Sequence, residues 1–337
     1  MRNALYIPLS GLYAFGVYIR HFLYDKHILV SHTVDVPTIC VGNIAVGGTG
    51  KTPMTAYIVE LLLQHGYHPA VLSRGYKRST CGFVMADKNA TTERVGDEAM
   101  QLHLRFPELP VAVCENRVRG ARQLQRQVKD LDVIVLDDAM QHRAIHCGFT
   151  ILLTPYDHLY IDDHILPWGT LRDLPSRALK ADAVVVTKCP DTIRPIDMRV
   201  IDNRLHLPTY QHLHFAGIDY APIKEQGNPL ILTGIARPEY MLEHVKRYYH
   251  QAKLLAFPDH HPFNPKDVET ILAQAKHYDF VLTTEKDMQR LRATSLEQDL
   301  QAQGKRLVAL PITTCFYTPH EDFDRQILTY VHENRRR

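Results

Sequence analysis

The strongest chemical signal in the sequence is a glycine-rich segment that ends in a lysine and a threonine. It follows the apolar residues 36–41, a predicted buried strand, and precedes an apolar helical pattern over residues 54–63. Strand, glycine-rich loop and helix is the order of a P-loop, in which backbone N–H groups surround phosphate oxygens. Lys51 would bridge the β- and γ-phosphates, and the Thr52 hydroxyl would ligate Mg²⁺. The residues predicted to bind the nucleotide are Asn43, Gly47, Gly48, Thr49, Gly50, Lys51 and Thr52.

A pair of aspartates follows a second apolar strand. Residues 132–136 are mostly β-branched and apolar, and Asp137 and Asp138 come directly after the core of this strand. At the C-terminal edge of a parallel strand, a carboxylate of this kind holds Mg²⁺ directly or through water. The two aspartates and Thr52 are therefore candidate metal-side residues, and Gln141 follows at the mouth of the same site.

Two more acids, Asp97 and Glu98, lie between these motifs in the sequence. One interpretation is a general base for an attacking hydroxyl, with the second acid assisting Mg²⁺. The alternative is a solvated helix N-cap, which is a common position for Asp. The residues alone favour neither interpretation.

Cationic and histidine-containing loops could complete such a site. Residues 73–78 are dense in Arg and Lys and could grip a phosphate, as could Arg117 and Arg172. For any single arginine, a surface position is the simpler interpretation. In residues 257–263, a histidine pair beside an aspartate could bind a metal ion, or one histidine could orient a carboxylate base across a cleft.

The elements that must position these residues follow an α/β pattern. The 337 residues include 39 Lys and Arg against 37 Asp and Glu, a balance that argues against a protein built to coat nucleic acid. With 45% hydrophobic residues the chain can bury a full core, and its 6 cysteines lack the spacing of a zinc or redox motif. Short buried strands alternate with helical segments, which predicts mostly parallel sheets covered on both faces. The predicted strands are residues 36–41, 70–72, 111–113, 132–136, 150–153, 183–186, 229–232, 253–257, 280–283 and 306–311.

The first thirty residues are apolar and aromatic but are too short and too interrupted for a spanning helix. Two interpretations remain from the residues: a helix in the membrane interface, or a first helix packed on the domain behind it. Periodicity weakens around residues 206–222, which suggests a short β linker. The expected organisation is an N-terminal helix (1–30), a P-loop domain (31–205), this linker (206–222) and a second α/β domain (223–337).

The combination of motifs resembles the tetraacyldisaccharide 4'-kinases, the lipid A 4'-kinases of Gram-negative bacteria. The resemblance covers nearly the whole chain and rests on motifs that occur in one order: Gly42-Asn43 with residues 46–53, residues 73–76, residues 96–98, Asp137-Asp138-x-x-Gln141-His142, Leu171-Arg172, residues 234–238, Phe257-x-Asp259-His260 and residues 284–287.

This resemblance implies a fold of two α/β/α sandwiches with the active site in the cleft between them. It implies transfer of phosphate from ATP, with Mg²⁺, to the 4'-hydroxyl of a tetraacylated disaccharide 1-phosphate, giving lipid IVA. The implied catalytic groups are Asp97 as base, His260 as its partner, and Lys51. The implied metal-side residues are Thr52, Glu98, Asp137 and Asp138, and the implied substrate-binding residues are Tyr76, Arg117, Gln141 and Arg172.

The family also implies a peripheral protein on the cytoplasmic face of the bacterial inner membrane. Its expected partners are the lipid substrate and the membrane surface, with no nucleic acid and no obligate protein partner. An acylated acceptor favours the interfacial interpretation of residues 1–30, because buried acyl chains leave a bilayer only at high cost. Two other classes remain open: a kinase for a soluble metabolite, and a P-loop ATPase that acts on a protein partner. Two residues depart from the family pattern, Asn116 and Ala139, and neither is a proposed catalytic group.

Overall fold

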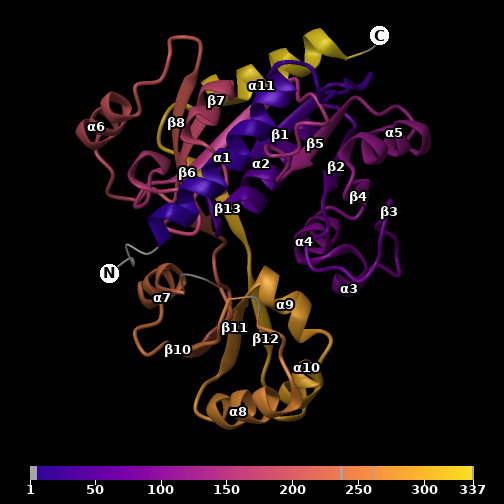
Figure 1. Ribbon diagram of the computed structural model, residues 1–337. Helices are drawn as coiled ribbons and strands as arrows, with labels where there is room; N and C mark the ends of the chain where they lie inside the picture. Colours follow the sequence, from indigo (N-terminus) through magenta and orange to yellow (C-terminus); the bar gives the residue numbers. More distant parts are fainter. Residues whose placement is uncertain (1–5, 236–237, 260, 336–337) are drawn as a thin grey trace.

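The computed structural model describes residues 6–235, 238–259 and 261–335, and in these ranges the chain forms a nine-stranded and a four-stranded sheet (Figure 1). The larger sheet has the order β13-β8-β7-β6-β1-β5-β2-β4-β3. Its neighbouring strands are parallel except at the two ends, where β13 pairs with β8 and β3 with β4 in antiparallel fashion. The strands are β1 (Thr38–Gly42), β2 (Pro69–Ser73), β3 (Val84–Met85), β4 (Val111–Val113), β5 (Val133–Asp137), β6 (Phe149–Pro155), β7 (Ala183–Thr187), β8 (His212–Tyr220) and β13 (Ile312–Phe316).

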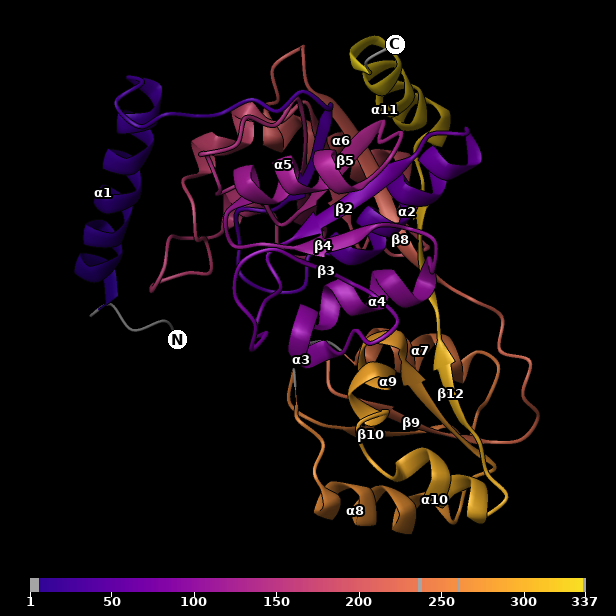
Figure 2. The same cartoon turned by 90° about the vertical axis from the view of Figure 1, so that its right-hand side faces the viewer.

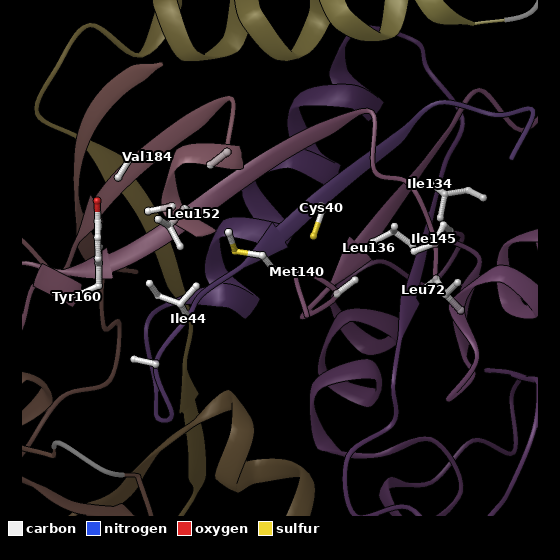
Figure 3. Packing of buried hydrophobic residues seen from close by; sticks show 14 of the residues in the cluster. Cys40, Ile44, Leu72, Ile134, Leu136, Met140, Ile145, Leu152, Tyr160 and Val184 are labelled. Atoms are coloured by element: carbon white, nitrogen blue, oxygen red, sulfur yellow. The ribbon is translucent and has the colours of Figure 1, made fainter. Parts of the chain in front are cut away.

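Helices cover both faces of this sheet, because alternate residues of its central strand face opposite ways. Ile39 and Val41 join a cluster with α2 and α11, while Cys40 joins a second cluster with α5 and α6. Figure 3 shows the second cluster around Cys40 and Leu136. The helices of this first domain are α1 (Tyr6–Asp25), α2 (Lys51–Gln64), α3 (Thr92–Val95), α4 (Asp97–Arg105), α5 (Arg117–Gln127), α6 (Pro195–Leu205) and α11 (His320–Asn334), with 3₁₀ turns at Tyr160–Asp162 and Pro175–Lys180.

The second domain is a smaller parallel sheet of order β10-β9-β11-β12. Buried Leu, Ile, Val and Phe side chains form a separate cluster on each of its faces. Its strands are β9 (Pro229–Thr233), β10 (Lys253–Ala256), β11 (Phe280–Thr284) and β12 (Leu307–Leu310), and its helices are α7 (Glu239–Lys246), α8 (Pro265–Ala275), α9 (Glu285–Leu291) and α10 (Leu296–Ala302). Each of the ten predicted strands overlaps a strand of the structure, which confirms the expected α/β class.

The domain boundaries differ from those expected. Residues 206–222 were expected to be a linker, but β8 within them is a strand of the first sheet and pairs with both β7 and β13. Residues 223–337 were expected to form the second domain, but β13 and α11 return to the first. The reason lies in α11, where Phe323, Ile327 and Val331 are fully buried in the cluster that contains α2. Figure 1 shows α11 beside the first sheet, at the end of the molecule away from α8.

The N-terminal helix α1 lies along one side of the first domain (Figure 2). Most of its large apolar side chains are exposed, including Leu12 at 70% and Phe15 at 60%. Its buried residues are instead polar, Ser10 and His21. In the part of the chain that the structure describes, no helix combines the length and the apolar character needed to span a bilayer.

Candidate active site

The phosphate loop connects β1 to α2, at the carboxyl edge of the first sheet. Gly47 and Gly50 adopt φ values of 112° and 88°, which lie in a region that glycine enters without steric cost. Beyond the loop, the Thr187 hydroxyl donates to the Thr49 carbonyl at 2.8 Å, and the Val46 N–H donates to the Thr170 carbonyl at 2.8 Å. The shape of the loop is therefore fixed by the end of β7 and by the segment around Thr170.

Lysine, arginine and aspartate side chains converge over this loop. Lys51 Nζ lies 3.4 Å from Asn43 Oδ1 and 3.9 Å from Asp138 Oδ2. Arg172 donates to Asn43 Oδ1 at 2.6 Å and to Asp138 Oδ2 at 3.0 Å, and it also contacts Asp138 Oδ1. Burial would raise the pKa of Asp138, but the Arg172 hydrogen bond and the Lys51 charge hold it below its usual range. Four predicted site residues thus form one connected cluster.

Asp137 is the buried acid of the site and differs sharply from its neighbour. Its side chain is fully buried, and its Oδ1 accepts from Thr55 Oγ1 at 3.4 Å. Burial, reinforced by the charges of Glu98 and Asp138, raises the pKa of Asp137 to about 7. Its Oδ2 has no hydrogen-bond partner among the described residues. A buried carboxylate oxygen without a partner is the kind of atom that a cation satisfies.

The acids alone do not make a complete metal site. Within the described ranges, no group of three or more His, Cys, Asp and Glu residues could hold a metal ion. Mg²⁺ in phosphoryl-transfer enzymes takes several ligands from phosphate and water and only one or two carboxylates from the protein. The bare oxygen of Asp137, with Thr52 at the start of α2, fits that kind of binding.

Two of the predicted substrate-binding residues, Arg117 and Gln141, make hydrogen bonds to the backbone around the site. Arg117 is only 2% exposed and donates to the Cys114 carbonyl at 2.9 Å and the Asp137 carbonyl at 3.2 Å. Gln141 Nε2 donates to the Asn43 carbonyl at 2.7 Å. The direct partners of both side chains are backbone carbonyls, so in this structure they hold the two strand ends in place.

Tyr76 and Asp97 lie together on the side of the site that faces the second domain. Tyr76 is exposed, and its carbonyl closely approaches Gly96, where an added Cβ would lie 3.0 Å from that oxygen. Gly96 precedes α4, so Asp97 is the first residue of that helix. This position at the helix start agrees with the N-cap interpretation of the sequence. The Asp97 carboxylate, however, is not simply solvated but contacts the second domain.

One partner of Asp97 is a residue that the sequence analysis missed. Arg290, on α9 of the second domain, donates to Asp97 Oδ2 through Nε at 2.9 Å and Nη2 at 2.7 Å. The motif at residues 284–287 lies just before it and was the only available signal. His260, the predicted partner of Asp97, lies outside the described residues. Nearby, Asp259 Oδ1 lies 3.7 Å from Lys286 Nζ, which also faces the interface.

Helix α1 contacts the loops that surround the site. Tyr13 donates to the Arg172 carbonyl at 3.1 Å, and Arg20 donates to the Gln141 carbonyl. His21 Nε2 lies 2.5 Å from Asp173 Oδ1, with both side chains buried. The polar side of α1 therefore faces the two loops that hold Asn43, and its apolar side faces outward.

The site as a whole can bind a polyphosphate and activate a hydroxyl. The glycine loop, Lys51 and Arg172 supply backbone N–H groups and positive charge for phosphate oxygens. Asp137 offers a ligand for a divalent cation, and Asp97 at the start of α4 adds a second carboxylate that could accept a proton. This combination of features is typical of phosphoryl transfer.

Comparison with known proteins gives consistent results over the whole chain. The model of the tetraacyldisaccharide-1-P 4'-kinase family matches residues 2–332. A tetraacyldisaccharide 4'-kinase of Flavobacterium johnsoniae is 43% identical, over 99% of this chain and 98% of that protein. One of Bacteroides thetaiotaomicron is 40% identical, over 98% of this chain and 93% of that protein. The crystal structure of LpxK from Aquifex aeolicus, described as an "apo" form in complex with ATP, superposes with a TM-score of 0.76 at 24% identity. The match covers 98% of this chain and 99% of that one.

Proposed function

The chain belongs to the tetraacyldisaccharide-1-P 4'-kinase family, and we propose that it phosphorylates the 4'-hydroxyl of a tetraacylated disaccharide 1-phosphate with ATP, giving lipid IVA. In this reaction the 4'-oxygen attacks the γ-phosphorus and the bond from γ-phosphorus to the bridging oxygen of ADP breaks. The hydroxyl proton passes to the base. A sugar hydroxyl is a weak nucleophile, so a positioned base and neutralised phosphate charge are what the protein must supply.

Each cluster of the site has a part in this proposal. The backbone of residues 47–50 and the Lys51 ammonium bind the phosphates. The hydrogen bond between Arg172 and Asn43 holds the loop in a fixed position relative to Asp138. Asp97 accepts the proton of the 4'-hydroxyl. His260 orients that carboxylate, as the family motif implies.

Mg²⁺ would be held by Asp137 and Thr52, with Glu98 and Asp138 nearby. When bound, it neutralises charge on the phosphate oxygens during transfer. The bare Oδ2 of Asp137 supports this assignment, because no other described group satisfies it. Both carboxylate oxygens of Asp138 accept hydrogen bonds from Arg172. Asp138 therefore contributes its negative charge near the metal ion and is not assigned as a direct ligand.

The observation that carries the choice of acceptor is the orientation of α1. A helix with exposed Leu12, Phe15 and Tyr18 on one side is suited to the lipid boundary. Its other side contacts the loops that carry Gln141 and Arg172. An enzyme anchored in this way presents its phosphate loop close to a membrane surface, where an acylated acceptor resides. We therefore also propose a peripheral location on the cytoplasmic face of the inner membrane.

A kinase assay with product analysis tests the proposal. Purified protein is incubated with radiolabelled ATP, Mg²⁺ and extracted lipid A precursor in mixed micelles, and the product is analysed by mass spectrometry. We expect a product heavier by one phosphoryl group at the 4' position. Lys51→Ala is the matched inactive control and should retain its circular dichroism spectrum. Phosphorylation of a water-soluble metabolite instead, or ATP hydrolysis without a phosphorylated lipid, would contradict the proposal.

A further inference from the structure

Arg290 is the point at which the second domain reaches the proposed base. Two of its nitrogens, Nε and Nη2, donate to the same carboxylate oxygen, Asp97 Oδ2. The two residues are 193 positions apart in the sequence and belong to different domains. The Arg290 side chain is 9% exposed and that of Asp97 is 24% exposed, so water screens this pair less than a surface ion pair.

Arg290 is itself held in a fixed position by a buried aspartate. Its Nη1 donates to Asp287 Oδ1 at 3.0 Å. Asp287 is fully buried, and its Oδ2 accepts from Thr233 Oγ1 at 2.9 Å, Thr284 Oγ1 at 2.8 Å and the Gly234 N–H at 2.9 Å. The guanidinium is thus tied to the carboxyl ends of β9 and β11.

We propose that Arg290 is a positioning residue that sets the orientation of the Asp97 carboxylate for proton transfer. This inference rests on the proposed function, in which Asp97 is the base. A guanidinium has a rigid fork of donors, so one side of it can be fixed by Asp287 while the other holds Asp97. The base on α4 is then in its productive orientation only when α9 of the second domain is docked beside it.

The geometry separates this role from phosphate binding. The Arg290 side chain donates hydrogen bonds to Asp97, Asp287 and the Gly234 carbonyl, and these three partners belong to α4 and the second domain and not to the phosphate loop. Loss of Arg290 should therefore affect turnover much more than nucleotide affinity. A displacement of a catalytic group by about 1 Å costs on the order of 10²-fold in rate.

The test compares steady-state kinetics of wild type, Arg290→Ala and Arg290→Lys, with Arg292→Ala as the matched control. Arg292 lies at the end of the same helix and is exposed. We expect Arg290→Ala to lower kcat roughly 10²-fold while KM for ATP stays within about twofold. Arg290→Lys should remain impaired because an ammonium lacks the fork. Millimolar guanidinium should restore part of the Arg290→Ala turnover but not that of Arg292→Ala.

A double-mutant cycle and a measurement without turnover complete the test. In an Asp97→Asn background, Arg290→Ala should cause almost no further loss, since the arginine acts through that carboxylate. Hydrogen exchange over α4 should be faster in Arg290→Ala than in Arg292→Ala, and this readout needs no kinase activity. Undiminished kcat in Arg290→Ala, multiplicative losses in the cycle, or unchanged exchange over α4 would overturn the inference. Failure of wild type to phosphorylate the lipid would instead overturn the proposed function.

Discussion

Replacing two outward-facing residues of α1 should weaken membrane binding without unfolding the protein. Leu12 and Phe15 are 70% and 60% exposed, so burying either in a lipid interface would remove most of its side chain from water. Full burial of such a side chain is worth about 1.5–3 kcal/mol, and these exposed fractions scale this to roughly 1–2 kcal/mol each. The double change Leu12→Ser with Phe15→Ser should thus lower the vesicle partition coefficient roughly 30- to 700-fold, because about 1.4 kcal/mol corresponds to a factor of ten.

Sedimentation with vesicles of phosphatidylethanolamine and phosphatidylglycerol measures this partition coefficient. The control is Val200→Ser with Tyr248→Ser, which removes two exposed apolar residues from α6 and from the end of α7. The control should bind vesicles like wild type. The melting temperature of the α1 variant should change little, since neither side chain is packed in a described core cluster. Normal vesicle binding by the α1 variant, or a large loss of melting temperature, would refute the assignment of this face to the membrane.

Three further outcomes test the site and the fold. Alanine at Asp97 or at His260 should each lower kcat roughly 10²- to 10⁴-fold, and the double variant should be little worse than either, as a double-mutant cycle would show. The pKa of Asp137 is about 7 in the folded chain against 3.8 in the unfolded chain, so between these values the folded chain keeps a proton that the unfolded chain releases. The free energy of unfolding without metal should therefore fall as pH rises from about 4 to 7. Denaturant titrations should show this pH dependence for wild type and not for Asp137→Asn. Phe323→Ala, a fully buried change on α11, should destabilise the first domain by about 3–5 kcal/mol in urea unfolding; a value near zero would show that α11 is not part of that core.

The features that the sequence predicted are those written in short contiguous stretches. The phosphate loop depends on residues 36–64, in which strand, glycines and helix follow one another, so local pattern is enough to place Lys51. Asp137 and Asp138 were found for the same reason, since strand and carboxylates are adjacent. The resemblance to a family then linked motifs such as Asp97 that spacing alone left ambiguous.

The features that were missed depend on contacts between distant residues. The Arg290–Asp97 pair joins two domains, and the hydrophobic periodicity of the sequence carries no information about a contact between residues so far apart. For Arg117, the residue type alone favoured a surface position, whereas the structure buries the side chain against the Asp137 carbonyl, and this burial depends on the tertiary fold. On α1, hydropathy identified an apolar helix but could not say whether the apolar side or His21 faces the protein.

The return of the chain to its first sheet has a consequence for biosynthesis. The second domain is encoded without interruption, from β9 to β12, whereas the first needs β13 and α11 to complete its edge and cover α2. As the chain is made from its N-terminus, the contiguous domain has all of its strands before the larger one does. The larger domain must leave the α2 surface that Phe323 covers open to solvent until α11 has been synthesised. During synthesis, the two domains can thus complete their folding in the opposite order to that in which they begin in the sequence. The second domain has its complete sequence first, and the phosphate-loop domain is the last to close its core.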